Sequence, residues 1–469
     1  MNNPKETLDI RTAPLAPAIV KLSLPILAGH VFVLLYNVVD TFFIARIDTS
    51  NPWLVGATGL VWPLYFVFMA TSFGISGGIS SLVARAIGAK KEHELDRTAE
   101  SGLFLGILIS AVIVISMYPL SSQMLRLFGG EGKLLEYGLE YLFWVLPAVP
   151  FMMLSAVFTG ILQGEGRTKY MMVSMMLGTV VNIILDPVLI FGAHMGIGGA
   201  GLATTIGNAV GFSYLLFIFL TTTSKVKIHW KVKNISFPVI GEIIRVGLPQ
   251  SMMNFLASIS FIFYNRIMVG INPMIITAFT LYSRLEQFAL IPIWSIMSAL
   301  SSIAGQAAGA LDFQRMKASS RVSTLLGMGV SGTLFIIFVS TSSFIFRVFQ
   351  SDAEVLGLAS QIVVWMAMTS FLSIPIFMVS SIMSVAGFAN RSLVYTAIKI
   401  YGFNLPACAL GAYVIGKNLN SAMMGIFISA VVSLLFYMVV QSVFFNGLES
   451  GKLKIRLPQK AAESVPVQE

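Results

Sequence analysis

Twelve long runs of apolar residues, separated by short polar segments, dominate the pattern of the chain. Most of them hold about 20 residues or more, the length that an α-helix needs to cross the hydrocarbon core of a bilayer. The pattern therefore predicts twelve transmembrane helices, at residues 17–44, 54–84, 99–119, 138–160, 170–191, 199–221, 240–268, 275–308, 321–346, 360–386, 394–415 and 421–446. Because the number is even, both chain ends are expected on one side of the membrane.

The second half of the chain repeats landmarks of the first half at a nearly constant offset. Lys21–Pro25 recurs as Arg245–Pro249, and Asn182 recurs as Asn404 at almost the same offset. Six spans in each half leave both halves in the same orientation, so the repeat is parallel and its axis lies along the membrane normal.

The repeat predicts an all-α integral membrane protein with twelve transmembrane helices in two six-helix bundles. The N-terminal bundle is expected over residues 1–221 and the C-terminal bundle over 241–446. A polar cytoplasmic linker over 222–240 joins them, and residues 447–469 form a cytoplasmic tail. Bundles that face each other enclose a cleft near the middle of the bilayer, the usual place for a transported substrate.

Composition and charge support a membrane protein. Apolar residues make up 56% of the chain and charged residues only 11%, whereas a soluble domain carries about 25% charged residues. Of the 30 Lys and Arg, 23 fall on the side of the chain ends, with Lys399 assigned to the loop after the tenth span, and 6 on the other side. Arg284 alone falls inside a span. The bias predicts a multi-pass cell-membrane protein with both termini in the cytoplasm, and it explains the net charge of +9 without nucleic acid.

Two acidic residues lie inside the apolar spans of the first half. Asp40 is deep in the first span, with Tyr36 and Asn37 on the same helix face, and Asp186 lies in the fifth span with Asn182 one turn before it. A carboxylate inside a membrane is costly and marks a functional site by default. Together such a pair can take up a proton or hold a cation, and the neutral oxygens beside it suit Na⁺. A purely structural role, linking helices, is the alternative.

The acid pair is not repeated in the second half. At the repeat offset, Asp40 corresponds to Tyr264 or Asn265, and Asp186 lies near the position of Cys408. The ion site is therefore expected in the N-terminal bundle only.

Other candidates lie at helix positions that polar or rigid residues rarely occupy. Glu286 and Arg284 fall in the eighth span, two residues apart and so on different faces; they form a secondary pair of candidates for protonation or packing. Pro25 and Pro249 interrupt the first and seventh spans, where a missing N–H can produce a hinge.

These motifs together resemble the multidrug and toxic compound extrusion (MATE) family, and the paired acids resemble its DinF-type branch. The resemblance implies the MATE fold with a V-shaped cleft, and a cation site formed by two aspartates, an asparagine and a threonine with tyrosines nearby. In this chain those positions are Asp40, Asp186, Asn182 and Thr204, a set that could hold Na⁺, with Tyr36 and Tyr141. The motifs that carry the resemblance are Leu22–Pro25, Tyr36–Thr41, Gly77–Arg85, Gln163–Thr168, Asn182–Pro187 and Met195–Thr205.

The predicted function is transport, not enzymatic catalysis. No Walker A sequence is present, so an H⁺ or Na⁺ gradient must supply the energy, with no cofactor. We expect a monomer in the lipid bilayer that exports amphipathic, often cationic small molecules by alternating access. The alternative is a flippase for a lipid-linked polysaccharide or cell-wall precursor, which the single basic residue within a span disfavours. A third class is a receptor that transports nothing.

Overall fold

The structure is a computed structural model, and it describes residues 10–457 except 52, 92, 222, 223, 225, 227–233, 350 and 351. Contacts divide the chain into two compact units. The N-terminal unit holds residues 28–248, 305–311 and the described residues from 455 on. The C-terminal unit holds 249–304, 312–454 and the described residues before 28.

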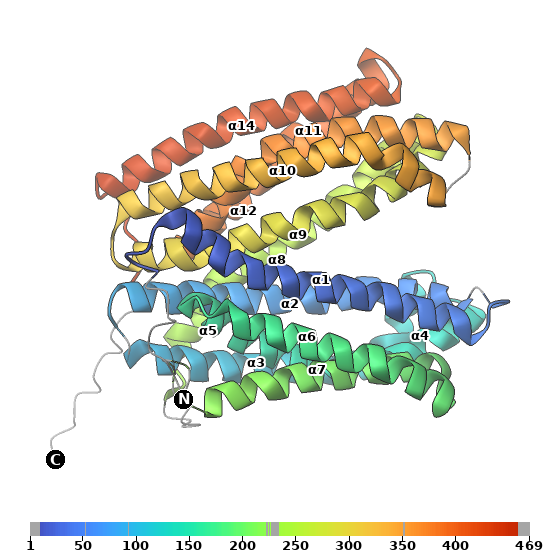
Figure 1. Cartoon of the computed structure of the whole chain (residues 1–469), viewed down its shortest axis with the longest axis horizontal. Helices are drawn as coiled ribbons and strands as arrows, with labels where there is room; N and C mark the ends of the chain where they lie inside the picture. The colour runs from blue at the N-terminus through green and yellow to red at the C-terminus, as the bar shows by residue number, and fades with distance from the viewer. Residues whose placement is uncertain are drawn as a thin grey trace. The chain divides into compact units, whose positions relative to one another are not determined.

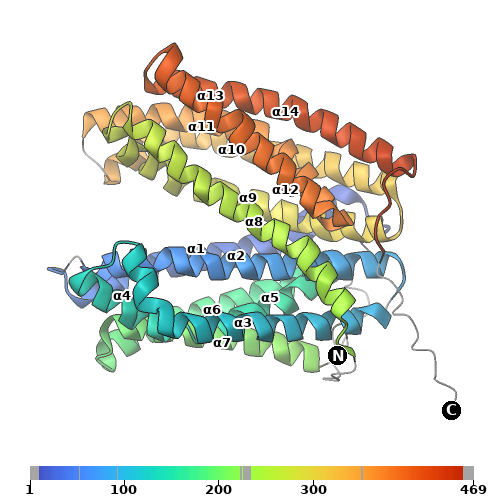
Figure 2. The same ribbon diagram turned by 180° about the vertical axis from the view of Figure 1, so that it is seen from behind.

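All regular elements in these described ranges are helices (Figures 1 and 2). Those of the first half are α1 (Leu15–Ile47), α2 (Trp53–Gly88), α3 (His93–Leu127), α4 (Gly132–Val145), α5 (Ala148–Glu165), α6 (Thr168–Pro187), the π-helix η2 (Val188–Gly192) and α7 (Gly196–Leu220). Those of the second half are α8 (Phe237–Val269), α9 (Met274–Gly309), α10 (Phe313–Phe349), α11 (Ala353–Met383), η4 (Ser384–Phe388), α12 (Ala389–Ala397), η5 (Ile398–Asn404), α13 (Leu405–Leu410), η6 (Gly411–Ile415) and α14 (Leu419–Glu449).

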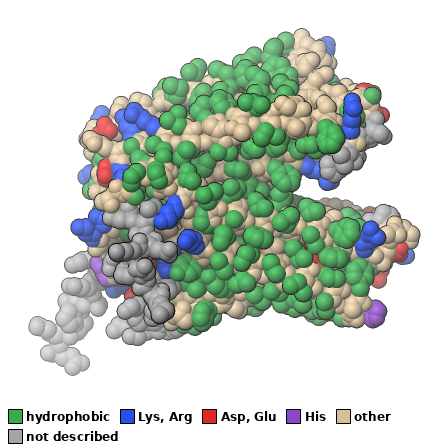
Figure 3. Space-filling view, viewed as in Figure 1, with side chains coloured by type: hydrophobic (Ala, Val, Ile, Leu, Met, Phe, Trp, Pro, Cys, Tyr) green, Lys and Arg blue, Asp and Glu red, His purple; other side chains and the backbone are tan. Residues whose placement is uncertain are grey.

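The predicted fold class, with its twelve spans, is confirmed within these ranges. Eleven helical stretches are long and apolar enough to cross a membrane. The longest, Ala353–Ile415, contains two predicted spans, because Gly387 interrupts it with a φ of 92°. Hydrophobic side chains cover the visible helix surfaces of each unit, and Lys and Arg gather toward helix ends (Figure 3). This surface is the one that a lipid environment requires.

The backbone repeats the landmarks of the sequence. Left-handed φ values occur mainly where the chain reverses direction between helices. Three such positions in the first half have counterparts in the second half at one constant offset: Lys90 (57°) and Leu311 (58°), Gly166 (75°) and Gly387 (92°), and Gly196 (55°) and Lys417 (52°). The two halves therefore turn in the same way at equivalent points, as a parallel repeat requires.

The two predicted hinge prolines lie inside continuous helices, Pro25 in α1 and Pro249 in α8. The boundary between the units crosses each helix near its proline, after Leu27 and before Pro249. Each of these helices thus contributes its beginning to one unit and its remainder to the other.

The position predicted for Lys399 is wrong. It does not lie in a loop after the tenth span but in η5, ten residues after α12 begins at Ala389 and about 15 Å along that helical stretch. The apolar pattern places the start of this span at residue 394. A lysine so close to the predicted start is assigned to the polar loop that precedes the span. Lys399 thus joins Arg284 as a basic residue in the interior of a described span.

The linker and tail predictions fall mostly on residues outside the described ones. Of the linker 222–240, residues 222, 223, 225 and 227–233 are outside, and the remainder includes the start of α8. Of the tail 447–469, α14 continues to Glu449, and residues 458–469 are outside.

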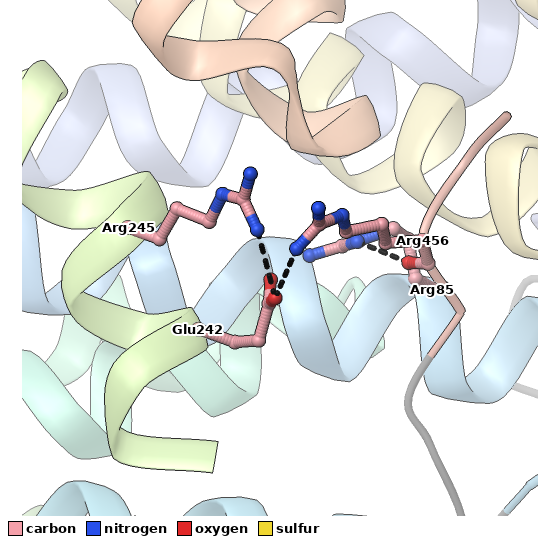
Figure 4. A network of polar contacts seen from close by, with 4 residues as sticks. All are labelled: Arg85, Glu242, Arg245 and Arg456. Atoms are coloured by element: carbon pink, nitrogen blue, oxygen red, sulfur yellow. Dashed lines mark hydrogen bonds and ion pairs between the residues drawn. The ribbon is translucent and has the colours of Figure 1, made fainter. Parts of the chain in front are cut away.

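Described residues of the tail are held on the N-terminal unit by a charged network (Figure 4). Arg85, at the end of α2, is buried, and its guanidinium donates a hydrogen bond to the carbonyl oxygen of Arg456. Glu242 Oε1 lies 3.3 Å from Arg456 Nη1 and 3.5 Å from Arg245 Nη1. The Nε–H of Arg85 also donates to the carbonyl oxygen of Ser81, one turn earlier in α2, at 3.2 Å.

Candidate functional site

Buried polar side chains of the N-terminal unit converge from helices α1, α6 and α7. Asp40 is 7% exposed, Asp186 is fully buried, and Asn182 and Thr204 are each 2% exposed. Asp186 lies close enough to Asp40 for its charge to act on the Asp40 carboxylate. The structure thus brings together the four residues that were expected to form the cation site.

Tyrosines link α1 and α4 to Thr204 of α7. The hydroxyl of Tyr36 lies 3.1 Å from Thr204 Oγ1, in a hydrogen bond between residues 168 positions apart. Tyr141 interacts with Thr204 and with both carboxylates. Asn37 has a different partner, because its amide donates to the carbonyl oxygen of Val33 on its own helix at 2.9 Å.

Close packing of two helices sets the positions of the α6 and α7 groups. A Cβ atom on Gly207 would lie 2.7 Å from the carbonyl oxygen of Gly178, and one on Gly178 would lie 2.9 Å from the oxygen of Gly207. Only glycine allows so close an approach of two backbones. This contact lies within one turn of Asn182 and Thr204, so it holds the amide and the hydroxyl near each other.

Several atoms of this cluster have no hydrogen-bond partner among the described residues. They are Oδ1 of Asp40, both carboxylate oxygens of Asp186, and both the oxygen and the nitrogen of the Asn182 amide. Leaving a buried polar atom unsatisfied costs about 1–3 kcal/mol, and more for a charged group. A proton or a hard cation would satisfy the acceptors, since carboxylate and amide oxygens are ligands that Na⁺ accepts. The donor set fits either ion.

Two residues next to the cluster were missed by the sequence reasoning. Tyr65 of α2 interacts with Asp40 and with Asn208. Asn208 is one turn after Thr204 and donates its amide to the Thr204 carbonyl oxygen at 2.8 Å. The i, i+4 spacing from Thr204 was a usable signal for Asn208. Tyr65 gave none, because tyrosines are common in spans and nothing local relates it to Asp40.

The secondary candidates lie on α9 in the C-terminal unit. Glu286 interacts with Tyr282 on its own helix, and both residues line a small pocket of about 30 Å³ with Ser370 of α11. Arg284 is exposed and is absent from that pocket lining. The structure therefore places Glu286 and Arg284 in different surroundings.

The C-terminal unit contains a second polar cluster at the repeat positions. Asn404 Oδ1 accepts a hydrogen bond from Ser429 Oγ at 3.1 Å. Tyr264 interacts with Asn404 and with Cys408, which is fully buried. This cluster contains hydroxyl, amide and thiol groups where the N-terminal cluster has carboxylates.

A duplicated twelve-span fold with buried polar groups at the bundle interior is that of a membrane transporter. Residues 25–188 and 249–410 match the MatE family model, so the chain belongs to the MatE family, the multidrug and toxic compound extrusion transporters, and is not an enzyme. Its assignment to the DinF-type branch stays a prediction.

Known proteins of this fold are similar at a modest level of identity. The multidrug export protein MepA of Staphylococcus saprophyticus is 24% identical over 340 residues, which cover 72% of this chain and 74% of that protein. MepA of Staphylococcus aureus is 24% identical over 278 residues, covering 59% of this chain and 61% of that protein. A solved outward-facing multidrug resistance MATE family transporter of the MOP superfamily superposes with a TM-score of 0.89 at 23% identity, over 96% of this chain and 100% of that one.

Proposed function

We propose that the protein is a cation-coupled antiporter, driven by H⁺ or Na⁺, that exports amphipathic and often cationic small molecules by alternating access. The relatives named above are multidrug export proteins, which supports this class of substrate. The observation that carries the proposal is the buried pair Asp40 and Asp186, whose unsatisfied oxygens are acceptors that an exchangeable ion can satisfy.

Coupling requires a group whose occupancy differs between the two sides of the membrane. A bound proton or Na⁺ compensates one negative charge of the carboxylate pair and lowers the cost of its burial. Release of the ion restores that cost, so the loaded and empty forms favour different arrangements of α1. Pro25 supports such a change, because it removes one backbone hydrogen bond from α1 close to where the helix passes from one unit to the other.

A flippase for a lipid-linked precursor is the second candidate. Lys399 favours it more than the sequence alone did, because it adds a basic residue to the described spans. The N-terminal cluster opposes it, since its ionisable groups are acids and tyrosines. Binding of a lipid-linked pyrophosphate, together with complete loss of drug export in Arg284→Gln, would favour the flippase.

The proposal is tested by drug efflux from proteoliposomes that contain the purified chain. A pH gradient and a Na⁺ gradient are imposed separately, and a fluorescent cationic drug reports transport. We expect efflux under at least one gradient and none in empty vesicles. Asp40→Asn should abolish the gradient-driven part. Transport that ignores both gradients would exclude coupled antiport, and an absence of any transport would favour the receptor class.

A further inference from the structure

The C-terminal unit contains a buried lysine whose charge no acid balances in the described part of the chain. Lys399 is 9% exposed and lies in η5, in the middle of the stretch from α12 to η6. Among the residues that the structure describes, its polar partner is Ser373 of α11, whose Oγ is 3.4 Å from Nζ. A charge in a membrane span is costly, and natural proteins keep one there for function.

The contacts of Lys399 are neutral and weak. Ser373 donates its own hydroxyl to the carbonyl oxygen of Thr369 at 3.0 Å, so its oxygen is left to accept from the amine. The ring of Phe377 lies 5.1 Å from Nζ, in a cation–π contact. A strong, charge-assisted hydrogen bond would need an anionic partner, and a ligand can supply one.

Aromatic side chains lie one turn on either side of the lysine. Tyr395 and Phe403, one turn before and after Lys399, both pack edge-on against Phe436, at 5.8 and 5.6 Å between ring centroids. Lys399 also lies in a π-helical segment, a local geometry found often at functional sites.

A polar seam on α11 links the lysine to the pocket of Glu286. Ser370 and Ser373 are three residues apart and therefore neighbours on one helix face. Ser370 lines the pocket with Tyr282 and Glu286, and Ser373 contacts Lys399. Glu286 and Lys399 thus lie beside neighbouring serines of α11, without an ion pair between them in the described part of the chain.

We propose that Lys399 is the residue of the C-terminal bundle that binds the carboxylate of amphipathic ligands. This inference rests on the proposed export of small molecules and names a residue that determines which of them are bound. The group lies about 15 Å from Ala389 and about 24 Å from Ile415 along the helical stretch. A free ligand that enters the bundle can reach it more easily than the phosphate of a lipid at the membrane surface.

The test compares rhodamine B, which has a free carboxylate, with its methyl ester, which lacks it. Binding of each dye is measured by fluorescence polarisation on the full-length chain in phosphatidylcholine nanodiscs. The wild type should bind the acid at least as tightly as the ester. Lys399→Gln should weaken binding of the acid about tenfold and leave the ester within about twofold. Lys399→Arg should keep the acid within about threefold of wild type, because its charge is retained.

Lys417→Gln is the matched control, since it removes a lysine from an exposed turn of the same unit; it should change neither dye. An unchanged ratio of acid to ester binding in Lys399→Gln, or an equal loss for both dyes, would overturn the proposal. If Lys399→Gln does not fold, binding to the wild type alone tests the proposal. Much tighter binding of the ester than of the acid would also overturn the proposal. Competition by added phosphatidylglycerol would assign the anion to a lipid headgroup and equally overturn it.

Efflux of the methyl ester under an ion gradient is recorded on the same preparations. If this efflux fails while the acid-to-ester ratio behaves as expected, the transport proposal fails and the anion site stands. The two proposals can therefore be contradicted separately.

Discussion

The N-terminal and C-terminal bundles place polar clusters on equivalent helices but fill them with different groups. The N-terminal cluster has acids on α1 and α6, and the C-terminal cluster has a phenol and a thiol at the counterparts of these acids. In chain order the N-terminal residues are Asp40, Asn182 and Asp186, and the residues at or near the corresponding positions of the repeat are Tyr264, Asn404 and Cys408.

The two clusters differ in whether their polar atoms have hydrogen-bond partners within the described chain. Asn404 receives a hydrogen bond from Ser429 and interacts with Tyr264, whereas the amide of Asn182 and both oxygens of Asp186 have no partner in the described chain. One helix arrangement can therefore be built with a satisfied neutral cluster. The acids of the N-terminal bundle are not needed for packing, which supports a role in binding an ion.

The largest effect is expected when the N-terminal cluster is made neutral like its counterpart. Asp40→Asn keeps the size of the side chain and resembles the protonated form, but it cannot release a proton or neutralise Na⁺. The variant should fold, reach the membrane and bind drug, yet lose gradient-driven efflux to the level of empty vesicles. Asp186→Asn should be impaired in the same direction and less severely, because the two acids titrate as a pair.

Glu286→Gln is the matched control for this first prediction, since it also neutralises an acid in a span. Its effect on coupling should be milder than that of either aspartate variant. If Asp40→Asn is expressed normally and pumps drug at the wild-type rate, the N-terminal ion site is wrong, and Glu286 becomes the leading candidate.

The reverse exchange, an acid placed in the C-terminal cluster, should mainly reduce stability. Cys408 is fully buried, so Cys408→Asp introduces a carboxylate among neutral groups such as Tyr264 and Asn404. We expect a loss of about 3 kcal/mol, seen as a lower midpoint when the protein is heated and its folded fraction is followed by size-exclusion chromatography. Cys408→Ser, the neutral control, should stay near wild type. Equal midpoints for both variants, with a rise on adding Na⁺, would mean that the C-terminal cluster can also hold an ion.

A smaller and more selective effect is expected from removing one hydroxyl in each cluster. Tyr36→Phe removes the 3.1 Å contact with Thr204, and Ser429→Ala removes the 3.1 Å contact with Asn404. Each should cost about 1 kcal/mol of stability. Only Tyr36→Phe should change the H⁺ or Na⁺ concentration that gives half-maximal efflux. A shift of the same size in Ser429→Ala would remove the functional difference between the clusters.

Most of the fold could be predicted from the sequence because lipid imposes a strong pattern. A span must be long and apolar, and a repeat of six spans fixes the relation of the halves. The pattern failed at Lys399, because one long side chain inside a span looks the same as a lysine at its edge when only hydropathy is read. Its burial depends on contacts with Ser373 and Phe377 of another helix, and no local signal reports those contacts.

The candidate site could be predicted because its acids lie in apolar spans, where burial of a carboxylate is costly. Asp40 and Asp186 are conspicuous in apolar runs, and their neighbours at helical spacing could be read directly. The membership of Tyr65 could not be, since it depends on where α2 crosses α1. Asn37 shows the opposite limit: it shares a helix face with Asp40, but its amide is used by the backbone of Val33. Helical spacing brings a side chain near a site without determining which partner it takes.

The smallest expected effect on activity belongs to a test of orientation, on which the comparison of equivalent helices depends. In a Cys408→Ser background, single cysteines are placed at three exposed positions, Glu131 before α4, Lys417 before α14 and Lys454 after α14. If the repeat is parallel and the basic loops are cytoplasmic, Glu131→Cys and Lys417→Cys should both react with an impermeant thiol reagent added outside intact cells. Lys454→Cys should react only after the membrane is permeabilised, and all three should export drug at rates near wild type. Labelling of one external position without the other would mean that the two bundles do not share an orientation, and the residues at the repeat offset would then no longer be equivalent.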